Sequence, residues 1–342
     1  MQSEKYSRDN AGQSLKRYIL LQQGELAYNH GASKAKQFGC CYELTEPEAR
    51  IPYVYHCFKI TDHEYTPYIA MALNNAKMDK QLKRLVSSSV RMDGLLNISF
   101  EDYMSVTLHL PPFNEQKRIA DFLQKIDERI AAQEKLLASL KKYKRGLLRA
   151  TFTREVLLAN SGTWERRKFS EIASLRRAKY TPSRADSRAC VELEHIEQQT
   201  GRLIKYVDSA EQNSIKSVFK QGDILFGKLR PYLRKYCLPQ FDGVCSSEIW
   251  VLVPEACVVS EYLFYLVQSD EFLAAANISS GTKMPRAEWS KVSNEDYFIP
   301  PISEQKRIAR MLSIVDHRIT TATEMLSALD RMRNSFLQQV FI

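Results

Sequence analysis

The chain reads Pro111-Pro112-Phe113-Asn114-Glu115-Gln116-Lys117-Arg118-Ile119-Ala120, and roughly 189 positions later it reads Pro300-Pro301-Ile302-Ser303-Glu304-Gln305-Lys306-Arg307-Ile308-Ala309. The same offset relates Asp127, Arg129 and Phe152 to Asp316, Arg318 and Phe341. A match that continues without a gap over about 40 residues indicates an internal duplication.

Each copy has the pattern of a helix start. Proline is tolerated in the first turn of a helix, where the amide groups lack partners. Asn114 and Ser303 are expected to be the N-caps, and the glutamate that follows each suits the helix dipole. The sequence therefore predicts that a helix begins at each Pro-Pro pair.

Apolar residues continue beyond each motif at alternating steps of four and three, which is the spacing of a coiled-coil seam. The expected helix-pairing residues are Ile119, Leu123, Ile126, Ile130, Leu137, Leu140, Ile308, Leu312, Val315, Ile319, Leu326 and Leu329. Lys144 and Arg333 interrupt the two seams. A helix of about 40 residues is about 60 Å long, so we expect the two helices to pair, antiparallel. The alternative is that each helix packs only on its own domain.

Composition limits the class of protein. Hydrophobic content is 44% and net charge is +9, which indicate a globular chain with a plausible anionic partner. The seven cysteines include no Cys-x-x-Cys pair, which suits the reducing cytoplasm and argues against disulfides and a zinc site. No signal peptide and no run long enough to span a membrane are found in the sequence.

Motifs of catalysis are missing. The chain has no glycine-rich phosphate loop and no Asn-Pro-Pro-Tyr motif of amino-methyltransferases. The histidines are dispersed without ligand spacing at positions 30, 56, 63, 109, 195 and 317. We therefore expect no catalytic residues, no metal and no cofactor.

The rest of the chain forms two globular segments of mixed α+β character. In the first we expect strands over 18–29, 40–44, 53–60 and 104–110 and a helix over 66–85. In the second we expect strands over 190–196 and 249–253 and a helix over 260–275. The predicted order is a globular domain over 1–110, a helix over 111–153, a linker over 154–163, a globular domain over 164–299 and a helix over 300–342.

The two globular segments differ in length. The stretch Leu21–Asn29 matches Phe219–Gly227, with Gly24 in the place of Gly222. By this match Trp164, where the second segment opens, corresponds to a position before Met1. We therefore expect the first domain to lack its opening portion.

This layout resembles the specificity subunit of type I restriction–modification systems. The resemblance rests on the two Pro-Pro-x-x-Glu-Gln-Lys-Arg-Ile-Ala motifs and on Gly222-Asp223-Ile224-Leu225, with a weaker form at Gly24-Glu25-Leu26. It implies two target recognition domains, each reading half of a split double-stranded DNA site, with paired helices between them that fix the spacing. It also implies docking of two methyltransferase subunits, which bind S-adenosylmethionine, and recruitment of restriction subunits.

Candidate DNA contacts follow the Gly-Asp turn. This cluster mixes cations, which neutralise phosphates and read guanine, with aromatic residues. In the second domain the residues that follow this turn are Lys228, Arg230, Tyr232, Arg234, Lys235 and Tyr236, and a separate candidate is the loop at Lys283 with Arg286. Those in the first domain are Asn29, Lys34, Lys36 and Arg91. A further basic run at Arg176, Arg177, Lys179 and Arg184 is equally consistent with a solvated surface.

Two other functions fit the same residues. The chain could be a coiled-coil scaffold whose globular domains bind protein, or an RNA-binding protein. Duplex DNA binding should weaken steeply with salt and prefer one sequence, whereas RNA binders prefer single strands.

Overall fold

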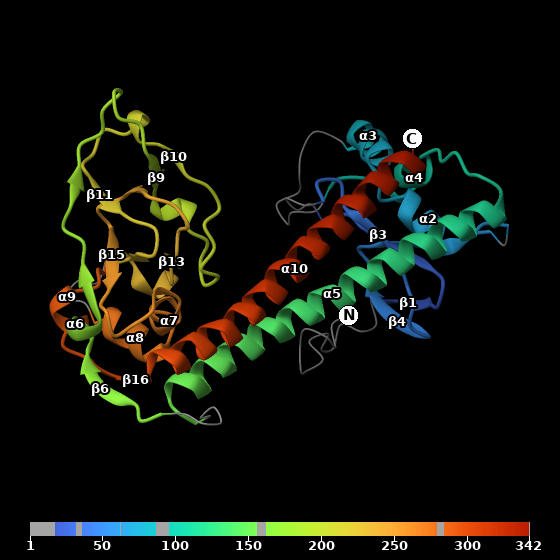
Figure 1. The fold of residues 1–342 in the computed structure, drawn as a ribbon. Coiled ribbons are helices and arrows are strands. Elements are labelled where there is room, and N and C mark those ends of the chain that lie inside the picture. Colours follow the sequence, from blue (N-terminus) through green and yellow to red (C-terminus); the bar gives the residue numbers. More distant parts are fainter. Residues whose placement is uncertain are drawn as a thin grey trace. The chain divides into compact units, whose positions relative to one another are not determined.

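The computed structural model describes residues 18–31, 36–61, 63–86, 96–155, 162–278 and 284–341 (Figure 1). The chain divides into two compact units, unit 1 with residues 1–134 and 325–342, and unit 2 with residues 135–324. The boundary crosses both long helices, α5 (Phe113–Phe152) and α10 (Ile302–Val340), so each unit holds part of each helix. The five segments delimited from the sequence stay a prediction.

Unit 1 is built on a small antiparallel sheet with β2 (Leu26–Asn29) at its centre. Strand β2 pairs with β3 (Cys40–Glu43) and β5 (His56–Phe58), and a separate pair joins β1 (Tyr18–Gln22) to β4 (Glu48–Pro52). Leu26 and Tyr28 of β2 are buried because strands flank them on both sides and helices cover them. The helices are α2 (Thr66–Ala72), α3 (Ala76–Leu85) and α4 (Phe100–Met104).

Two expectations for unit 1 were wrong. The helix expected over 66–85 is two helices, because the Asn75 side chain caps α3 by accepting from the amides of Lys77 and Met78. The strand expected over 104–110 is absent, since α4 ends at Met104 and residues 105–110 pair with no strand among the described residues.

Unit 2 has two larger sheets. The first has the order β13 (Tyr236–Cys237), β12 (Ile224–Gly227), β15 (Ile249–Pro254) and β7 (Ala173–Leu175). The second has the order β10 (Val207–Asp208), β9 (Ala189–Val191), β14 (Gly243–Cys245), β11 (Lys216–Phe219) and β8 (Lys179–Tyr180). A further pair joins β16 (Asp296–Ile299) to β6 (Glu165–Lys168). Short helices complete the unit: α6 (Phe169–Ile172), α7 (Ser260–Leu266), α8 (Asp270–Ala276), α9 (Trp289–Val292) and the 3-10 turns η2 (Leu193–His195), η3 (Ser209–Glu211) and η4 (Pro231–Leu233).

The same two kinds of correction apply in unit 2. The helix expected over 260–275 breaks into α7 and α8, because Ser269 caps α8 by accepting from the Phe272 amide at 3.2 Å. The strand expected over 190–196 stops at Val191 and turns into η2. The strand over 249–253 is confirmed as β15.

The matching of the two globular segments is confirmed in detail. Gly24 and Gly222 both adopt a positive φ, of 82° and 92°, which favours glycine. Strand β2 stands between β3 and β5 as β12 stands between β13 and β15. The breaks at Asn75 and Ser269 fall at the same place in the two copies. In unit 2, β7 adds a strand beyond β15, and this strand comes from the opening portion that the first segment was expected to lack.

The antiparallel pairing of the helices is confirmed in each unit. In unit 1, Phe122 of α5 lies against Phe336 of α10, with ring centroids 4.9 Å apart, and Asp127 pairs with Arg333. In unit 2, Lys144 Nζ lies 2.7 Å from Asp316 Oδ1. Higher residue numbers on α5 therefore meet lower numbers on α10.

The expected seam is only partly a helix–helix seam. Ile308 and Leu312 are buried in the core of unit 2, together with Leu148 and Phe152 from the other end of α5. Ile119 packs on the core of unit 1, as do Val340 and Phe341. Both alternatives are therefore partly right, since the helices pair and also pack on the globular parts. The remaining seam residues are buried or half-buried along the helices: Leu123, Ile126, Ile130, Leu137, Leu140, Val315, Ile319, Leu326 and Leu329.

The expected N-caps were wrong. Helix α5 begins at Phe113 and α10 at Ile302, so Asn114 and Ser303 lie inside the first turn. The carbonyls of Pro112 and Pro301 accept the first helical hydrogen bonds instead, from the backbone amide of Gln116 at 3.1 Å and from that of Gln305 at 3.0 Å.

The glutamine of the repeated motif joins each long helix to its globular part. Gln305 is fully buried, accepts from the Val259 amide at 2.9 Å and donates to the carbonyls of Cys257 and Pro300. Gln116 does the same in unit 1, where it accepts from the Tyr65 amide at 3.0 Å and donates to the Pro111 carbonyl. Tyr65 and Val259 are the N-caps of α2 and α7, so the motif orients an equivalent helix in each unit.

Candidate nucleic-acid interface

A buried carboxylate fixes the turn before the basic loop of unit 2. Asp223 is 3% exposed, and its Oδ2 accepts from the Lys220 amide at 2.7 Å. Arg176 donates to both carboxylate oxygens, at 2.7 and 2.8 Å, and these bonds raise the pKa of its guanidinium. In unit 1, Glu25 accepts from the Gln22 amide at 2.9 Å in the same way. Strand β12 and the loop after it therefore start from a rigid anchor.

Two stretches that were separate candidates in the sequence meet in the structure. The Arg230 amide donates to the Pro285 carbonyl at 2.8 Å, and the Ala287 amide donates to the Lys228 carbonyl at 2.8 Å. Arg286 lies beside Glu248, with 3.0 Å between Nε and Oε2. The loop over 228–236 and the segment over 284–287 therefore form one surface.

The backbone of this loop is unusual. Arg230 and Arg234 have φ values of 51° and 53°, and they bracket η4. Left-handed backbone costs energy for residues other than glycine and is concentrated at functional sites. The bend leaves Tyr232 53% exposed at the tip.

The six candidates in this loop divide into two groups. Lys228, Arg230 and Tyr232 are half-buried or exposed and can reach a ligand. Tyr236 is 3% exposed and donates to the Gln199 carbonyl at 3.0 Å, so its assignment to DNA contact is corrected to a structural role.

Lys235 and Arg234 are also engaged within the unit. The Lys235 ammonium donates to the Leu193 carbonyl, and burial lowers the pKa of this lysine. Arg234 lies 3.3 Å from Asp270. Both residues of β13, Tyr236 and Cys237, are buried, so no alternation along this strand marked Tyr236 as an inward residue.

The structure describes only some of the remaining DNA-contact candidates. Lys34, Arg91 and Lys283 lie outside the described residues. Asn29 is at the end of β2, where its side chain accepts from the Gly31 amide at 2.9 Å, and Lys36 is exposed.

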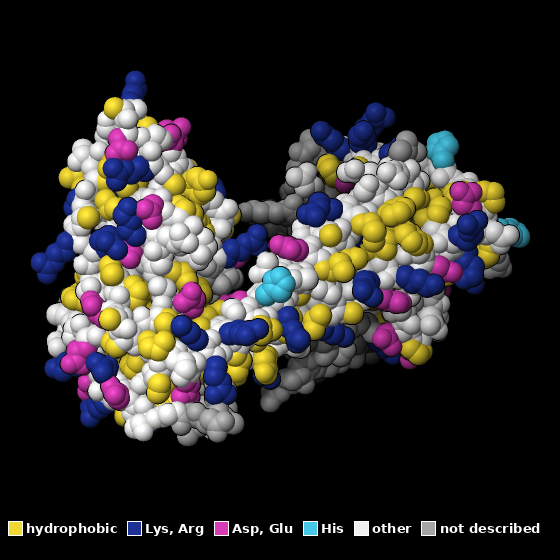
Figure 2. Space-filling model, viewed as in Figure 1, with side chains coloured by type: hydrophobic (Ala, Val, Ile, Leu, Met, Phe, Trp, Pro, Cys, Tyr) yellow, Lys and Arg dark blue, Asp and Glu magenta, His cyan; other side chains and the backbone are white. Residues whose placement is uncertain are grey.

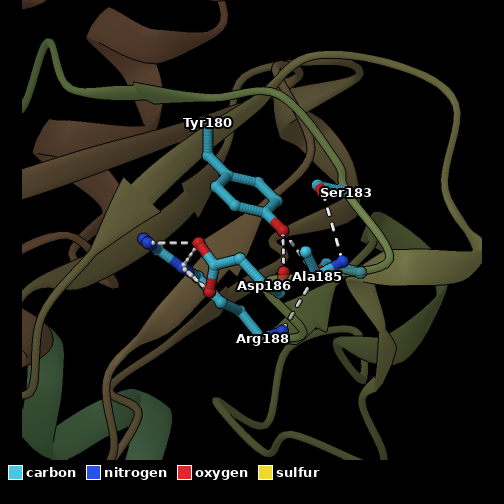
Figure 3. A network of polar contacts seen from close by, with 6 residues as sticks. Tyr180, Ser183, Ala185, Asp186 and Arg188 are labelled. Atoms are coloured by element: carbon cyan, nitrogen blue, oxygen red, sulfur yellow. Dashed lines mark hydrogen bonds and ion pairs between the residues drawn. The ribbon is translucent and has the colours of Figure 1, made fainter.

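A second loop, over 181–188, contains Arg184 of the further basic run, and its internal contacts were not identified from the sequence (Figure 3). The Arg188 guanidinium lies 4.6 Å from the Tyr180 ring centroid and donates to Asp186, while the Tyr180 hydroxyl donates to the Asp186 carbonyl. Arg184 is exposed within this loop. Of the nearby basic run, Arg176 is held by Asp223 and Lys179 by Ser217, so Arg177 and Arg184 are the more accessible cations.

Charges of both signs are spread over the visible face. Figure 2 shows Lys and Arg side chains over the long helices and over the strands of unit 2, with acidic side chains among them. Within the described ranges, no group of His, Cys, Asp and Glu has the arrangement of a metal site. In the same ranges, no helix combines the length and apolar character needed to cross a bilayer.

Comparisons with known proteins agree on one family. The family described as "Type I restriction modification DNA specificity domain" matches residues 24–142 and 161–330. The chain is 26% identical over 187 residues to the type I restriction enzyme EcoDI specificity subunit of Escherichia coli, with 54% of this chain and 42% of that protein covered. It is 24% identical over 282 residues to the MjaVIII specificity subunit of Methanocaldococcus jannaschii, with 70% and 62% covered. The chain therefore spans less than two thirds of the length of these relatives.

Solved structures show the same fold. A chain from a structure on the assembly and conformational transition of the type I R-M system gives a TM-score of 0.56 at 15% identity, with 95% of this chain and 83% of that chain covered. The type I S subunit from M. genitalium gives a TM-score of 0.54 at 15% identity, with 96% and 85% covered.

Proposed function

Because the chain belongs to the type I restriction–modification DNA specificity family, we propose that it is the DNA-recognition subunit of such a complex. Each unit reads one half of a bipartite site in double-stranded DNA. The paired helices set the distance between the halves. The chain itself catalyses no reaction, and a partner methyltransferase binds S-adenosylmethionine.

One observation supports this proposal above the others, namely that the duplication extends to individual polar contacts. Gln116 and Gln305 occupy the same position in the two copies and hold equivalent helices. Asp127–Arg333 and Lys144–Asp316 are likewise equivalent pairs. A chain with two equivalent halves suits a ligand with two separated sites, because each half can contact one site in the same way.

A second feature concerns the methyltransferase partners. Large apolar side chains are exposed at the same places in both helices. They are Leu136 (49%), Tyr143 (60%), Met325 (45%) and Met332 (39%). Leu136 and Tyr143 of α5 are seven residues apart, as are Met325 and Met332 of α10, so the two residues on each helix share one face. Exposed apolar stripes mark interaction sites, and two equal stripes suit two copies of one partner. Restriction subunits then join through the complex.

Sequencing of methylated DNA tests the proposal. The chain is expressed in cells together with a candidate type I methyltransferase. We expect methylation at a two-part motif with a spacer of fixed length, confined to cells that contain the chain. An identical methylation pattern with and without the chain would reject DNA recognition.

A duplex-binding measurement separates the proposal from RNA binding and from a protein scaffold. Affinity for the methylated motif should exceed affinity for scrambled duplex and should fall steeply with salt. Preference for single-stranded RNA would favour the RNA-binding alternative, and binding to neither would favour the scaffold.

A further inference from the structure

Unit 2 contains a cleft beside the long helices, and the accessible candidates of the basic loop, Lys228, Arg230 and Tyr232, do not line it. Its volume is about 410 Å³, and it lies among α5, α10 and the loop over 197–202. Lys141 and Arg145 of α5, Arg202 of the loop and Thr320 and Thr323 of α10 are among its lining residues. A neighbouring cavity of about 420 Å³ shares Arg145 and Gln199.

Two of the cations that line this cleft are paired with carboxylates. Lys144 is paired with Asp316 at 2.7 Å, and Arg234, which lines both cavities, lies 3.3 Å from Asp270. The Glu197 carboxylate accepts from Thr200 at 2.8 Å.

Three further cations line the cleft. Lys141, Arg145 and Arg202 are exposed, and no ion pair of theirs is found in the part of the chain that the structure describes. These three cations outnumber the one further carboxylate that lines the cleft, that of Glu197, so the cleft carries a net positive charge that favours an anionic ligand.

The loop wall is held in a strained conformation. Gln199 has a φ of 66°, and its amide donates to the carbonyl of Arg234, itself at 53°, with a length of 2.9 Å. The Tyr236 hydroxyl donates to the Gln199 carbonyl. Gly201 has a φ of 76°, and a Cβ there would lie 2.5 Å from Phe264 Cζ. Left-handed backbone at non-glycine residues such as Gln199 and Arg234 persists only where the surroundings impose it and is concentrated at ligand sites.

We propose that this cleft binds backbone phosphates of the DNA duplex through Lys141, Arg145 and Arg202. The inference rests on the proposed function and deepens it, since it assigns DNA contact to helix α5 as well as to the recognition loops. Contacts to phosphates fix the position of a protein on the duplex and carry no base information directly. The cleft therefore contributes affinity and placement, while Arg230 and Tyr232 contribute to the reading of bases.

Salt dependence of binding provides the test. The cleft variant carries Lys141→Gln, Arg145→Gln and Arg202→Gln. The control variant carries Arg129→Gln, Lys135→Gln and Lys291→Gln, three exposed cations outside the cleft, and so removes the same charge. Fluorescence anisotropy with the full chain gives Kd for a short duplex between about 50 and 200 mM salt, a range over which phosphate contacts dominate the change in affinity.

The expected result is a smaller slope of log affinity against log salt in the cleft variant. The slope should fall by about 0.9 for each phosphate that the cleft variant no longer neutralises, relative to the control variant. Affinity should weaken equally for specific and scrambled duplex, because phosphate binding does not read sequence. Ethylation interference should show phosphates that block the wild-type chain and have no effect on the cleft variant.

Equal slopes for the cleft and control variants, with normal binding by the wild-type chain, would overturn the cleft proposal and leave the proposed function intact. Loss of sequence preference in the cleft variant alone would also overturn it, because the cleft would then read bases. A wild-type chain that binds no duplex would reject the proposed function itself.

Discussion

Lys144 Nζ lies 2.7 Å from Asp316 Oδ1, with the lysine side chain 8% exposed. At the same places in the other copy, Asp127 pairs with Arg333, where the side chains are 42% and 37% exposed. Lys144 and Arg333 are the residues that interrupt the two apolar seams. A buried charge on one helix that needs an opposite charge on the other favours one register and one direction of packing.

We predict that Lys144→Met destabilises unit 2 by about 3 kcal/mol, because it leaves the Asp316 carboxylate without its cation in a mostly buried place. The double variant Lys144→Met with Asp316→Leu should recover most of this loss. Urea unfolding of the four proteins of the cycle measures the coupling. Additive effects of the two substitutions would contradict the account.

The equivalent pair in unit 1 should matter less. We expect Arg333→Met to cost about 1 kcal/mol or less, since both side chains are well exposed and water screens the pair. The same urea experiment compares it with Lys144→Met. A larger cost for Arg333→Met than for Lys144→Met would show that exposure does not govern these pairs.

Gln305→Leu should destabilise unit 2 by about 3 kcal/mol. The substitution removes an acceptor from the Val259 amide and a donor from two buried carbonyls, and unsatisfied buried groups cost about 1–3 kcal/mol each. Gln338→Leu, at an exposed position of the same helix, is the control and should change stability by less than about 0.5 kcal/mol. Similar effects of the two changes in urea unfolding would refute the role of Gln305 in joining α10 to the globular part of unit 2.

Alkaline pH should weaken unit 2 through Cys237. Burial raises the pKa of this thiol from 9.0 to about 12. The unfolded chain therefore ionises first, and the stabilising contribution is present below about pH 9 and is lost as pH rises toward 12. For this one group the slope approaches about 1.4 kcal/mol per pH unit. Urea unfolding of wild type and Cys237→Val from pH 8 to pH 11 should show a flatter decline in the variant, and parallel declines would contradict the assignment.

The exposed apolar stripes predict partner stoichiometry. Tyr143→Asp and Met332→Asp should each remove one methyltransferase copy from the complex, because they occupy the same place in the two helices. The two changes together should remove both. Native mass spectrometry of the co-purified complex gives the count, and Arg129→Gln is a control that changes a surface charge. Loss of both copies from either single variant would reject independent, equivalent docking.

The sequence predicted the repeated architecture well because hydrophobic spacing and turn glycines act locally. Gly24 and Gly222, both long helices and the central strands β2 and β12 were all identified from local patterns. The breaks at Asn75 and Ser269 were missed, because a side-chain cap overrides a continuous amphipathic pattern. The role of Gln116 and Gln305 was missed because it depends on contacts about 50 residues away in the chain.

The candidate interface was predicted less completely. Composition identified the basic loop, but it did not distinguish Arg230, which is exposed, from Lys235, which is turned to a backbone carbonyl. That distinction depends on the left-handed backbone at Arg230 and Arg234, which non-glycine residues rarely adopt. The cleft of unit 2 joins residues from α5, α10 and the loop over 197–202, so no single stretch of sequence carries its pattern.

The most direct measurement is the methylated motif produced by a variant of one unit. Arg230→Ala with Tyr232→Ala, compared with the control Lys291→Gln, is sequenced for methylation in cells that contain the partner methyltransferase. The account predicts that one half of the two-part motif is relaxed or changed, while the other half and the length of the spacer stay the same. A change in both halves or in the spacer, or a motif without two parts, would contradict it.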